Sequence, residues 1–230
     1  IDTLFDHNSK QWRIFTEIVT KTPELLLLNS LFATNGYQLR IAGGAVRDLL
    51  CGHRPKDIDL ATDATPDQMN HMIRNRRNIW VLKTSSGHRN GTVMARVNDK
   101  LNYEITTLHK WSTDETPGKP IFITDWRTDA EHRDLTINAM YLSFDGRLYD
   151  YFDGLQDLQH RRIRFVDTAE RPIRQNAITI LRYFRFYCEF GGGHPHDPSI
   201  LSTIGQYSHH LLHTSEQNLW KEFKKILSLD

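Results

Sequence analysis

The sequence contains few of the features that define secreted, membrane-spanning or strongly basic proteins. It has only two cysteines, Cys51 and Cys188, with no metal-binding spacing between them, which predicts reduced thiols in an intracellular protein. No apolar run approaches the roughly 20 residues that a helix needs to cross a bilayer, so the leucines at 25–28 are predicted to be core. The formal net charge of +1 excludes an overall basic, nucleic-acid-binding composition, and any such contact must be local.

Internal repeats and low-complexity segments are also absent, and the composition is that of an ordinary folded protein. The 230 residues suffice for one large or two small domains. Patterns typical of strands and helices alternate up to about residue 166, and only helical patterns follow. We therefore predict an α+β fold, with a domain at 1–166 that includes N-terminal helices and a helical region at 167–230.

Local signals place the elements of this fold. Ser9, Thr22 and Thr65 are predicted to cap helices. Helices are expected at 8–35 (two), 65–76, 169–190, 197–210 and 215–227. Strands are expected at 79–82, in a hairpin of 92–97 with 103–108, and in a hairpin of 139–144 with 148–151. A turn is expected at 87–91 and a mobile loop at 110–119. The last helix has no closing pattern, which predicts that the full protein continues.

The stretch from residue 39 to 62 is the most informative for chemistry, because it indicates a strand, a glycine turn, a short helix and a second strand with two acids. Gly43 and Gly44 free the backbone to approach a ligand, and the following helix aims its amino end at an anion. Arg47 adds a cation nearby. Alternate side chains of an extended chain share a face, so Asp57 and Asp59 are predicted to point the same way.

This pattern predicts a site for nucleotidyl transfer. Two adjacent carboxylates repel each other unless a cation lies between them. Mg²⁺ prefers oxygen ligands and leaves positions open for phosphate oxygens, so it fits that need. The alternative is a tight turn followed by two solvent-facing acids. The spacing from Gly43-Gly44, Arg47 and Asp48 favours the functional interpretation.

A second group of polar residues lies at 131–139. Arg133 can contact a phosphate, and Asp134 and Asn138 can form hydrogen bonds with ribose hydroxyls. The alternative is a capped turn in which Asp134 or Asn138 satisfies nearby backbone groups. This segment alone leaves both interpretations open.

A third group lies on the helix expected around 174–186. Asn176, Thr179, Arg182 and Arg185 follow one another at intervals of three and are predicted to share one helical face. Such a face can reach both a triphosphate and the edge of a base, and the alternative is a solvated basic face. The apolar side of the helix is predicted to consist of Ile178, Leu181, Phe184 and Tyr187 or Cys188.

Together these segments resemble the class II tRNA nucleotidyltransferases, known as CCA-adding enzymes, and their relatives the bacterial poly(A) polymerases. The resemblance covers nearly the whole chain and is closest to eukaryotic, mitochondrial-type members. The family pattern Gly-Gly-x-Val-Arg-Asp, followed by Asp-x-Asp, is matched at 43–48 and 57–59. The pattern Arg-Arg-Asp-x-Thr-x-Asn-Ala is matched at 133–139, with His132 in place of the first arginine. His109 likewise replaces the arginine that usually follows the strand at 104–108.

The resemblance implies a nucleotidyltransferase head of the DNA polymerase β type with a mixed sheet, followed by an all-α neck and partial body, without the family's tail. It implies template-independent addition of CCA to tRNA 3′ ends from CTP and ATP, with two Mg²⁺ ions held by Asp57 and Asp59. Glu104 is a possible third acid, and a salt-bridged strand residue is an equal alternative for it. The nucleotide-binding residues implied are Gly43, Gly44, Arg47, Arg133, Asp134, Asn138, Arg182 and Arg185.

The resemblance further implies that the acceptor stem and 3′ end of tRNA are the macromolecular partner, that no membrane is involved, and that the location is mitochondrial, cytoplasmic or both, with the targeting segment outside the chain. The loop at 110–119 matches a flexible loop that helps the family switch from C to A addition. A basic track for the acceptor stem is expected at Arg161, Arg162, Arg164, Arg171, Arg174, Arg182 and Arg185. Surface positions, rather than zinc binding, are expected for His194, His196, His209 and His213.

The chain departs from the family pattern where the base is selected. The family has Glu-Asp-x-x-Arg-x-x-Arg, whereas this chain has Gln175, Asn176, Thr179 and then Arg182. In the family, the Asp and the first Arg read the Watson–Crick edge of CTP or ATP, and threonine is too short to replace an arginine fork. We therefore expect weaker or different base selection at Asn176 and Thr179. The alternatives are a related CC- or poly(A)-adding polymerase, a catalytically impaired tRNA-binding module, and an unrelated domain with a fortuitous motif.

Overall fold

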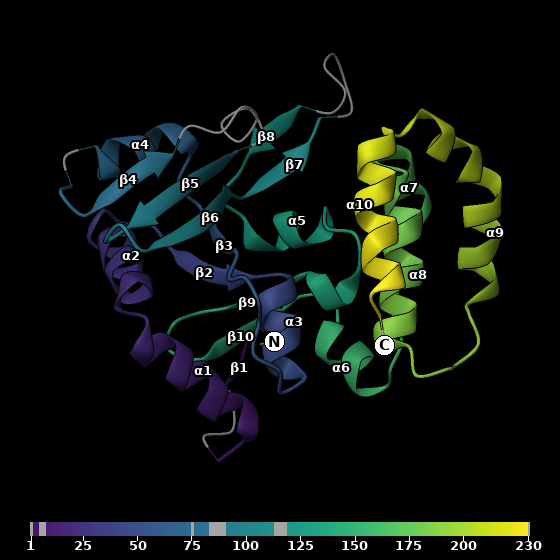
Figure 1. The fold of residues 1–230 in the computed structure, drawn as a ribbon, viewed down its shortest axis with the longest axis horizontal. Coiled ribbons are helices and arrows are strands. Elements are labelled where there is room, and N and C mark those ends of the chain that lie inside the picture. The colour runs from purple at the N-terminus through teal and green to yellow at the C-terminus, as the bar shows by residue number, and fades with distance from the viewer. Residues whose placement is uncertain (1, 5–7, 75, 83–90, 113–118, 230) are drawn as a thin grey trace.

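The fold has a sheet with helices packed on it and a separate group of helices at one end of the molecule (Figure 1). The computed structural model describes residues 2–4, 8–74, 76–82, 91–112 and 119–229. Figure 1 shows the C-terminal helices α7–α10 side by side, with α5 between them and the sheet. This arrangement confirms the predicted α+β class with a mixed sheet. No helix within the described ranges combines the length and apolarity needed to cross a membrane.

Eight strands of the described residues form the main sheet, in the order β1-β10-β9-β2-β3-β6-β5-β4. Only β3 and β6 pair in parallel among these neighbours. The strands are β1 Asp2–Leu4, β2 Leu39–Ala42, β3 Leu60–Thr62, β4 Ile79–Leu82, β5 Thr92–Val97, β6 Leu101–Thr107, β9 Met140–Leu142 and β10 Arg147–Asp150. A small separate sheet pairs β7 His109–Trp111 with β8 Pro120–Phe122. Both predicted hairpins are confirmed, as β5–β6 and β9–β10.

The two acids of the predicted second strand lie just before it, because β3 begins only at Leu60. Leu60 pairs with Ile41 of β2, and Gly43 then turns that neighbouring chain away from the sheet. The Asp59 carbonyl still accepts a hydrogen bond from Ala42 N at 2.9 Å. The prediction that Asp57 and Asp59 lie within a strand is therefore wrong by a few residues, although Asp59 remains tied to the end of β2.

Helices α1 (Lys10–Lys21), α2 (Pro23–Thr34), α3 (Gly44–Leu50) and α4 (Pro66–Ile73) share one hydrophobic core with the sheet. Ser9 caps α1, and Thr65 forms a capping box with Gln68. Thr22 occupies the cap position of α2, as predicted, although its side chain forms no capping hydrogen bond. Leu25 and Leu28 are fully buried, as predicted for the leucine run, whereas Leu26 is exposed.

The helix predicted at 169–190 is in fact two helices, α7 (Glu170–Gln175) and α8 (Ile178–Phe190). Asn176 interrupts them with an extended backbone, at φ −155° and ψ 102°. Its side-chain oxygen accepts a hydrogen bond from Ile178 N at 3.2 Å. Asparagine competes in this way with the helical hydrogen bonds, so α8 starts afresh after it. Asn176 therefore does not share a helical face with Arg182, and that prediction is wrong.

The buried side of α8 also differs from the predicted one. Ile180, Tyr183 and Phe186 are buried, whereas the predicted apolar residues Ile178, Leu181, Phe184 and Tyr187 are half-buried and Cys188 is exposed. The reason is the second core, in which Phe165 stacks on the Tyr183 ring at a centroid distance of 5.7 Å. Packing against this core therefore buries the side of α8 that carries Tyr183, rather than the side predicted from the apolar residues of the sequence.

The remaining described elements complete the helical end and its connection to the sheet. The second core joins residues of 135–165 to α7, α8 and α9, so it spans the expected boundary near residue 166. These elements are α5 Trp126–Glu131, η2 Thr136–Asn138, α6 Gly154–Gln159, α9 Pro198–Tyr207, η3 Ser208–His213 and α10 Glu216–Leu227. The helix expected at 65–76 ends at Ile73, and the one expected at 197–210 divides into α9 and η3. The turn at 87–91 and the loop at 110–119 fall largely outside the described residues.

Candidate active site

A glycine turn between β2 and α3 forms the centre of the main cleft. Gly43 has φ 64°, a left-handed conformation that favours glycine. A Cβ atom at this position would lie 3.3 Å from Arg133 Nη1 and 3.6 Å from the Asn138 carbonyl oxygen. Gly43 N already donates to the Met140 carbonyl at 3.1 Å. Gly43 therefore contributes a backbone conformation and space for Arg133, while its own amide is used within the sheet.

The cleft around this turn has a volume of about 840 Å³ and collects residues from distant parts of the chain. Its walls contain most of the residues that the sequence singled out: Gly43, Gly44, Arg47, Asp57, Asp59, Glu104, Arg133, Asp134, Asn138, Arg182 and Arg185. Asn176 and Thr179 are not among its lining residues. Side chains that the sequence did not single out also line it: His53, Arg54, Lys56, Asp129, Glu189 and Lys225.

Three carboxylates form one wall of the cleft, from Asp57, Asp59 and Glu104. The surrounding protein displaces water from the Asp59 carboxylate, and the charge of Asp57 adds to this effect, so both raise the Asp59 pKa. Burial and the charge of Asp59 likewise raise the pKa of Glu104. Glu104 lies within salt-bridge distance of no basic group among the described residues, so the salt-bridged alternative gains no support.

The acid wall fits a hard divalent cation as part of a ligand set. The mutual repulsion of Asp57, Asp59 and Glu104 is the electrostatic condition that such a cation relieves. No group of three or more candidate ligand side chains is close enough to hold a metal by itself within the described ranges. Mg²⁺ is ordinarily held by one or two carboxylates plus substrate phosphates and water, so a two-carboxylate site is sufficient for it.

Arg47 is buried at 8% exposure and is held by two hydrogen-bond acceptors. Its Nη2 lies 2.7 Å from Asp48 Oδ1, and its Nη1 donates to Asn138 Oδ1 at 2.6 Å. Asn138 Nδ2 in turn donates to Asp134 Oδ1 at 3.4 Å. Asn138, which the sequence assigned to the sugar, thus connects α3 to the segment of Asp134.

Asp134 and Glu222 bind the two arginines of α8. Asp134 Oδ2 accepts from Arg182 Nε at 2.6 Å, and Glu222 Oε1 accepts from Arg185 Nε at 2.5 Å. Burial acts to raise the pKa of each carboxyl group, but the neighbouring guanidinium outweighs it and holds the pKa of both below its ordinary value. Asp134 also accepts from Leu135 N at 2.8 Å, so the capped-turn interpretation describes part of its role.

Phe186 of α8 lies against three arginines at once and is itself buried at 3% exposure. The guanidinium carbons of Arg185, Arg47 and Arg182 lie 4.0, 4.8 and 5.6 Å from its ring centroid. An aromatic ring attracts cations through its quadrupole, by about 0.5–2 kcal/mol per contact. Phe186 therefore brings Arg47 of the sheet side next to the arginines of α8.

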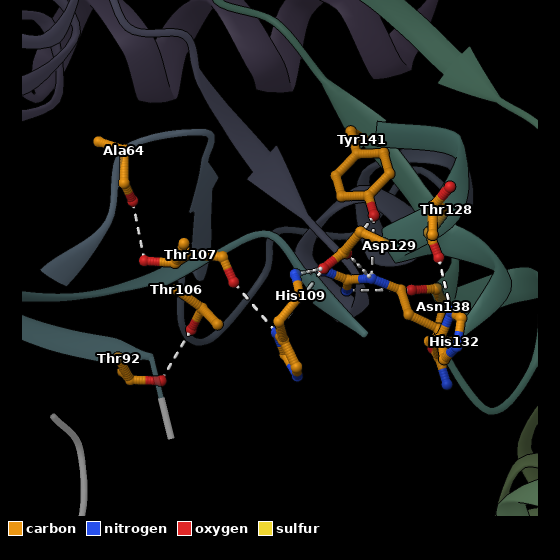
Figure 2. A network of polar contacts seen from close by, with 11 residues as sticks. Ala64, Thr92, Thr106, Thr107, His109, Thr128, Asp129, His132, Asn138 and Tyr141 are labelled. Atoms are coloured by element: carbon orange, nitrogen blue, oxygen red, sulfur yellow. Dashed lines mark hydrogen bonds and ion pairs between the residues drawn. The ribbon is translucent and has the colours of Figure 1, made fainter. Parts of the chain in front are cut away.

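Arg133 is oriented by a buried pair, Asp129 of α5 and Tyr141 of β9, and Figure 2 shows these two side chains. Asp129 Oδ2 accepts from Arg133 Nε at 3.2 Å and from the Tyr141 hydroxyl. The same Nε lies 3.2 Å from Tyr141 Oη. Burial opposes the charge of Arg133, but Tyr141 and Asp129 outweigh it and raise the arginine pKa. This pair was not predicted from the sequence, although Asp129 lies four residues before Arg133, the spacing of a helical ion pair.

The two histidines that replace family arginines both line the cleft. His109 Nδ1 lies 3.0 Å from the Thr107 carbonyl, and His132 Nδ1 lies 2.8 Å from the Thr128 carbonyl (Figure 2). A carbonyl oxygen only accepts hydrogen bonds, so this geometry assigns the proton to Nδ1 in both rings and leaves Nε2 for other contacts.

The two residues predicted to select the base lie apart from this cleft. The Asn176 side-chain oxygen is used at the start of α8, and Thr179 is buried at 5% exposure. Neither residue lines the cleft, because the break before α8 separates Asn176 from the arginine side of that helix. Arg182 and Arg185 do face the cleft, so the third predicted group is brought to the site only in part.

The histidines predicted at the surface are exposed, with one partial exception. His194, His209 and His213 are exposed, whereas His196 is half-buried, stacks on Tyr187 at 3.6 Å and lies 3.0 Å from the Tyr183 hydroxyl. No metal-binding group among the described residues includes any of the four. Both cysteines are free, with Cys188 exposed and Cys51 partly buried.

A mixed sheet with a glycine turn, an acid wall and buried arginines around one cleft defines an α+β protein whose cleft is suited to phosphate groups. Comparison with known families then places the chain: it belongs to the family of poly A polymerase head domains, which matches residues 39–164.

The most similar relatives include the human mitochondrial CCA tRNA nucleotidyltransferase 1, which is 45% identical over 208 residues, or 90% of this chain and 47% of that protein. The CCA-adding enzyme of Bacillus subtilis is 33% identical over 84% of this chain and 47% of that protein. The fold matches the crystal structure of the Bacillus stearothermophilus CCA-adding enzyme in complex with CTP, with a TM-score of 0.74, 31% identity and coverage of 90% of this chain and 48% of that one. The chain spans about half the length of these relatives, and the comparison confirms the predicted nucleotidyltransferase fold.

Proposed function

We propose that this chain transfers nucleotides from CTP and ATP to the 3′ end of tRNA without a nucleic-acid template. The observation that supports this most is the cleft, which gathers Asp57, Asp59 and five arginines from separate segments. In the reaction, the 3′-hydroxyl oxygen attacks the α-phosphorus of the nucleotide and loses its proton. A new phosphodiester bond forms, the α–β phosphoanhydride bond breaks, and pyrophosphate leaves.

The basic wall is suited to the triphosphate. Arg133 lies next to Gly43 and Arg47 lies next to Gly44, and Arg182 and Arg185 line the same cleft from α8. Their acidic and aromatic partners hold the guanidinium groups in place before the substrate arrives, which lowers the cost of ordering them on binding. Asp134 and Asn138 are proposed to contact the sugar through the hydrogen-bonding positions that their arginine partners leave free.

The acid wall is suited to Mg²⁺, with Asp57 and Asp59 as its protein ligands and Glu104 as a third acid. When bound, two such ions lower the pKa of the attacking hydroxyl and neutralise charge on the leaving pyrophosphate. The residues themselves position the site: Asp59 is anchored through its carbonyl to Ala42 N, next to the glycine turn.

Base selection remains assigned to Asn176 and Thr179 only through the family resemblance. Because neither residue lines the cleft, we expect weaker or different discrimination among nucleotides than the family pattern gives. A CC- or poly(A)-adding activity and a tRNA-binding module without catalysis are the alternatives. The intact acid pair favours an enzyme over the second of these.

The tRNA is proposed to lie along the basic residues of the helical end. Arg162 and Arg164 lie just before that end, between α6 and α7, and both pair with the buried Asp157, at 3.2 and 2.9 Å. Arg174 pairs with Glu170 at 3.1 Å. These side chains are about half exposed, so each retains donors for phosphates, although the ion pairs reduce the local positive charge.

Residues 1–166 are proposed as the catalytic head and residues 167–230 as the neck and partial body. The second core ties these two parts together through Phe165 and Tyr183, which supports a neck that is rigidly placed next to the cleft. The names of the vertebrate relatives support a mitochondrial location, with a cytoplasmic pool as the alternative. Imaging the tagged full-length protein against markers of both compartments tests this.

The decisive experiment incubates the protein with a tRNA that lacks its CCA end, Mg²⁺ and each labelled nucleotide singly and together. Ordered addition of C, C and A is the expected result. Repeated A addition supports the poly(A) alternative, and C addition that stops before A supports the CC alternative. Absence of incorporation together with tRNA binding contradicts the proposed activity and supports the binding module.

A further inference from the structure

Two histidines line the main cleft together with Arg133, and the same kind of backbone contact fixes both rings. His109 belongs to β7, and His132 lies at the end of α5. Nδ1 of each ring lies within hydrogen-bond distance of a carbonyl oxygen, that of Thr107 at 3.0 Å and that of Thr128 at 2.8 Å. Both side chains are half-buried, so one edge of each ring is held by the protein and the rest borders the cleft.

The second ring nitrogen, Nε2, has opposite properties in the two protonation states. The carbonyl partner assigns the proton of the neutral ring to Nδ1, so Nε2 carries a lone pair and can only accept. Within the described ranges, no hydrogen bond uses Nε2 of either ring. A second proton makes Nε2 a donor and gives the ring a positive charge. Nε2 therefore repels a phosphate oxygen while the ring is neutral and binds it once the ring is protonated.

Asp129 holds both histidines and Arg133 in one network. Its Oδ1 accepts from the backbone N of His109 at 2.8 Å and lies 3.7 Å from Nδ1 of that ring. Its carbonyl accepts from the backbone N of His132 at 3.1 Å, and its Oδ2 accepts from Arg133 Nε at 3.2 Å. Figure 2 shows both rings extending from this network on the side away from Tyr141. One buried acid thus places three groups that can carry positive charge along the cleft.

The charged groups around the two rings have mixed signs. The charged residues on the elements around the rings are Lys110 of β7, Asp129 and Glu131 of α5, Arg133 and Asp134 of the following turn, Arg171 of α7 and Arg182 of α8. Arg171 reaches α5 directly, because its Nη2 donates to the Glu131 carbonyl. Negative groups favour a charged ring and positive groups oppose it. The negative charges of a bound phosphate chain add to the first group and favour protonation of both rings.

His160 shows the same local contact without the cleft. It ends α6 as His132 ends α5, with φ of −91° against −88°. Its Nδ1 lies 2.8 Å from the carbonyl of Gln156, four residues earlier, which is the distance and spacing found for His132 and Thr128. His160 is exposed and is not among the residues that line the main cleft. The carbonyl contact is therefore a feature of the helix end, and the position in the cleft is what distinguishes His132.

We propose that His109 and His132 bind phosphate oxygens of the nucleotide through Nε2, so that nucleotide binding takes up protons from solvent. Arg133 is always charged, whereas a histidine ordinarily gains its charge only near about pH 6.5 and below. The affinity for nucleotide therefore increases as the pH falls through this range. This inference rests on the proposed function, because it concerns the nucleotide of that reaction.

The experiment measures the Kd of CTP with Mg²⁺ between about pH 6 and pH 8, without tRNA, so that no nucleotide is transferred. The double variant His109→Gln with His132→Gln cannot gain the charge, and the double variant His109→Arg with His132→Arg always carries it. His160→Gln is the matched control, because it removes the same carbonyl contact outside the cleft. Thermal unfolding checks that each variant is folded.

Two other groups titrate in the same range, so each result is compared with the double glutamine variant. A terminal phosphate loses its last proton near about pH 6. His53 also lines the cleft. Both are present in every sample, so their contribution cancels in the difference between wild type and the double glutamine variant.

We expect the Kd of wild type to fall about tenfold more than that of the double glutamine variant between about pH 8 and pH 6. His160→Gln should follow wild type. The double arginine variant should lack this additional fall and bind CTP at about pH 8 at least as tightly as wild type does there. Calorimetry in two buffers of different ionisation enthalpy should show that wild type takes up about one proton more per nucleotide than the double glutamine variant.

Tripolyphosphate in place of CTP tests which part of the nucleotide the rings contact. The same difference between wild type and the double glutamine variant is expected, because this probe carries the phosphates without base or sugar. A difference that appears with CTP and not with tripolyphosphate overturns the phosphate assignment. Equal pH dependence of wild type and the double glutamine variant overturns it as well.

The two proposals fail separately. If wild type incorporates nucleotides and its pH dependence of binding equals that of the double glutamine variant, only the assignment of the histidines fails. If wild type incorporates nothing but the double glutamine variant loses the pH-dependent binding, the histidines bind phosphate and the proposed catalytic function fails.

Discussion

The carboxylates of Asp57, Asp59 and Glu104 lie on one wall of the cleft without a basic partner within salt-bridge distance among the described residues, whereas each arginine of the opposite wall is held by an acid. Burial, together with the charge of a neighbouring acid, raises the pKa of Asp59 and of Glu104. The arginines are paired, stacked and largely buried, as Arg47 illustrates. The acid wall is thus electrostatically unfavourable without a cation, whereas the side chains of the arginine wall are already held in place without a ligand.

The two walls illustrate two ways in which a protein can place charge in a binding site before the substrate arrives. Unpaired acids are available to bind a cation that arrives with the substrate. Until a cation binds, their mutual repulsion lowers the stability of the folded protein. Paired arginines keep their orientation without a ligand, so their positive charge is in place before the substrate binds. The acids that hold them also neutralise part of this charge. The predictions below test this contrast, from the largest expected effect to the smallest.

The acid wall is tested first, by Asp59→Asn and Asp57→Asn. Each variant should lower nucleotide incorporation at least about a thousandfold, because a cation site worth several kcal/mol is removed. The melting temperature of Asp59→Asn should equal or exceed that of wild type, because the substitution removes a repelled charge. Full incorporation by either variant would contradict the assignment of the acids, and a large loss of stability would contradict the view that they repel.

The arginine wall is tested by Phe186→Leu, with Phe165→Leu as a matched control. Both phenylalanines are buried in the second core, at 3% and 4% exposure. Phe165 stacks on Tyr183, and no arginine of the described residues lies over its ring. Both variants should lose about 1–2 kcal/mol of stability. Only Phe186→Leu should also raise the KM for nucleotide, by about tenfold, since three guanidinium contacts are lost. Equal KM values in the two variants would show that the ring only fills space.

Tyr141→Phe tests whether the Asp129 pair orients Arg133. The substitution removes the hydroxyl that donates to Asp129, at a cost of about 1–3 kcal/mol of stability, and should raise the nucleotide KM a few-fold. Tyr103→Phe is the matched control, because the buried Tyr103 hydroxyl has no hydrogen-bond partner among the described residues. Tyr103→Phe should leave the KM unchanged and keep or increase stability. A KM unchanged in Tyr141→Phe would contradict an orienting role.

The paired acids of the arginine wall should make stability depend on acid pH. The pKa of Asp134 and of Glu222 is held below the ordinary values of 3.8 and 4.5, so both contribute stability at neutral pH. That contribution is lost as the pH falls through the lowered values, because the unfolded chain then binds more protons than the folded one. Asp134→Asn should therefore reduce the fall of the melting temperature between about pH 7 and pH 3. An identical pH profile in the variant would contradict the strength of this ion pair.

The smallest effect is expected at the start of α8. Asn176→Asp with Thr179→Arg should sharpen the preference for C and A over U and G, measured by single-nucleotide incorporation. The aspartate can still accept from Ile178 N, so the helix start is kept. Asn176→Ala, the control, should cost about 1 kcal/mol of stability and leave base choice unaltered. If the double variant selects bases as wild type does, Asn176 and Thr179 do not determine base choice here.

The two walls also differ in how far they could be predicted from the sequence. The acid pair and the glycine turn were predictable, because their chemistry depends on residues that are adjacent or a few positions apart. The partners of the arginines were not, since Asp134 and Arg182 are 48 residues apart and Arg47 and Asn138 are 91 apart. The break at Asn176 was missed because local competition by one side chain ended a pattern that is otherwise helical.

The amino-acid sequence alone determined the fold class and the residues that make up the acid wall and the basic groups, because short-range spacing and residue type are sufficient for these. Only the tertiary structure decided that Phe186 brings three arginines together, that Asp129 and Tyr141 orient Arg133, and that Asn176 and Thr179 lie outside the cleft. The physical reason is that packing of the second core acts between segments that no local pattern connects.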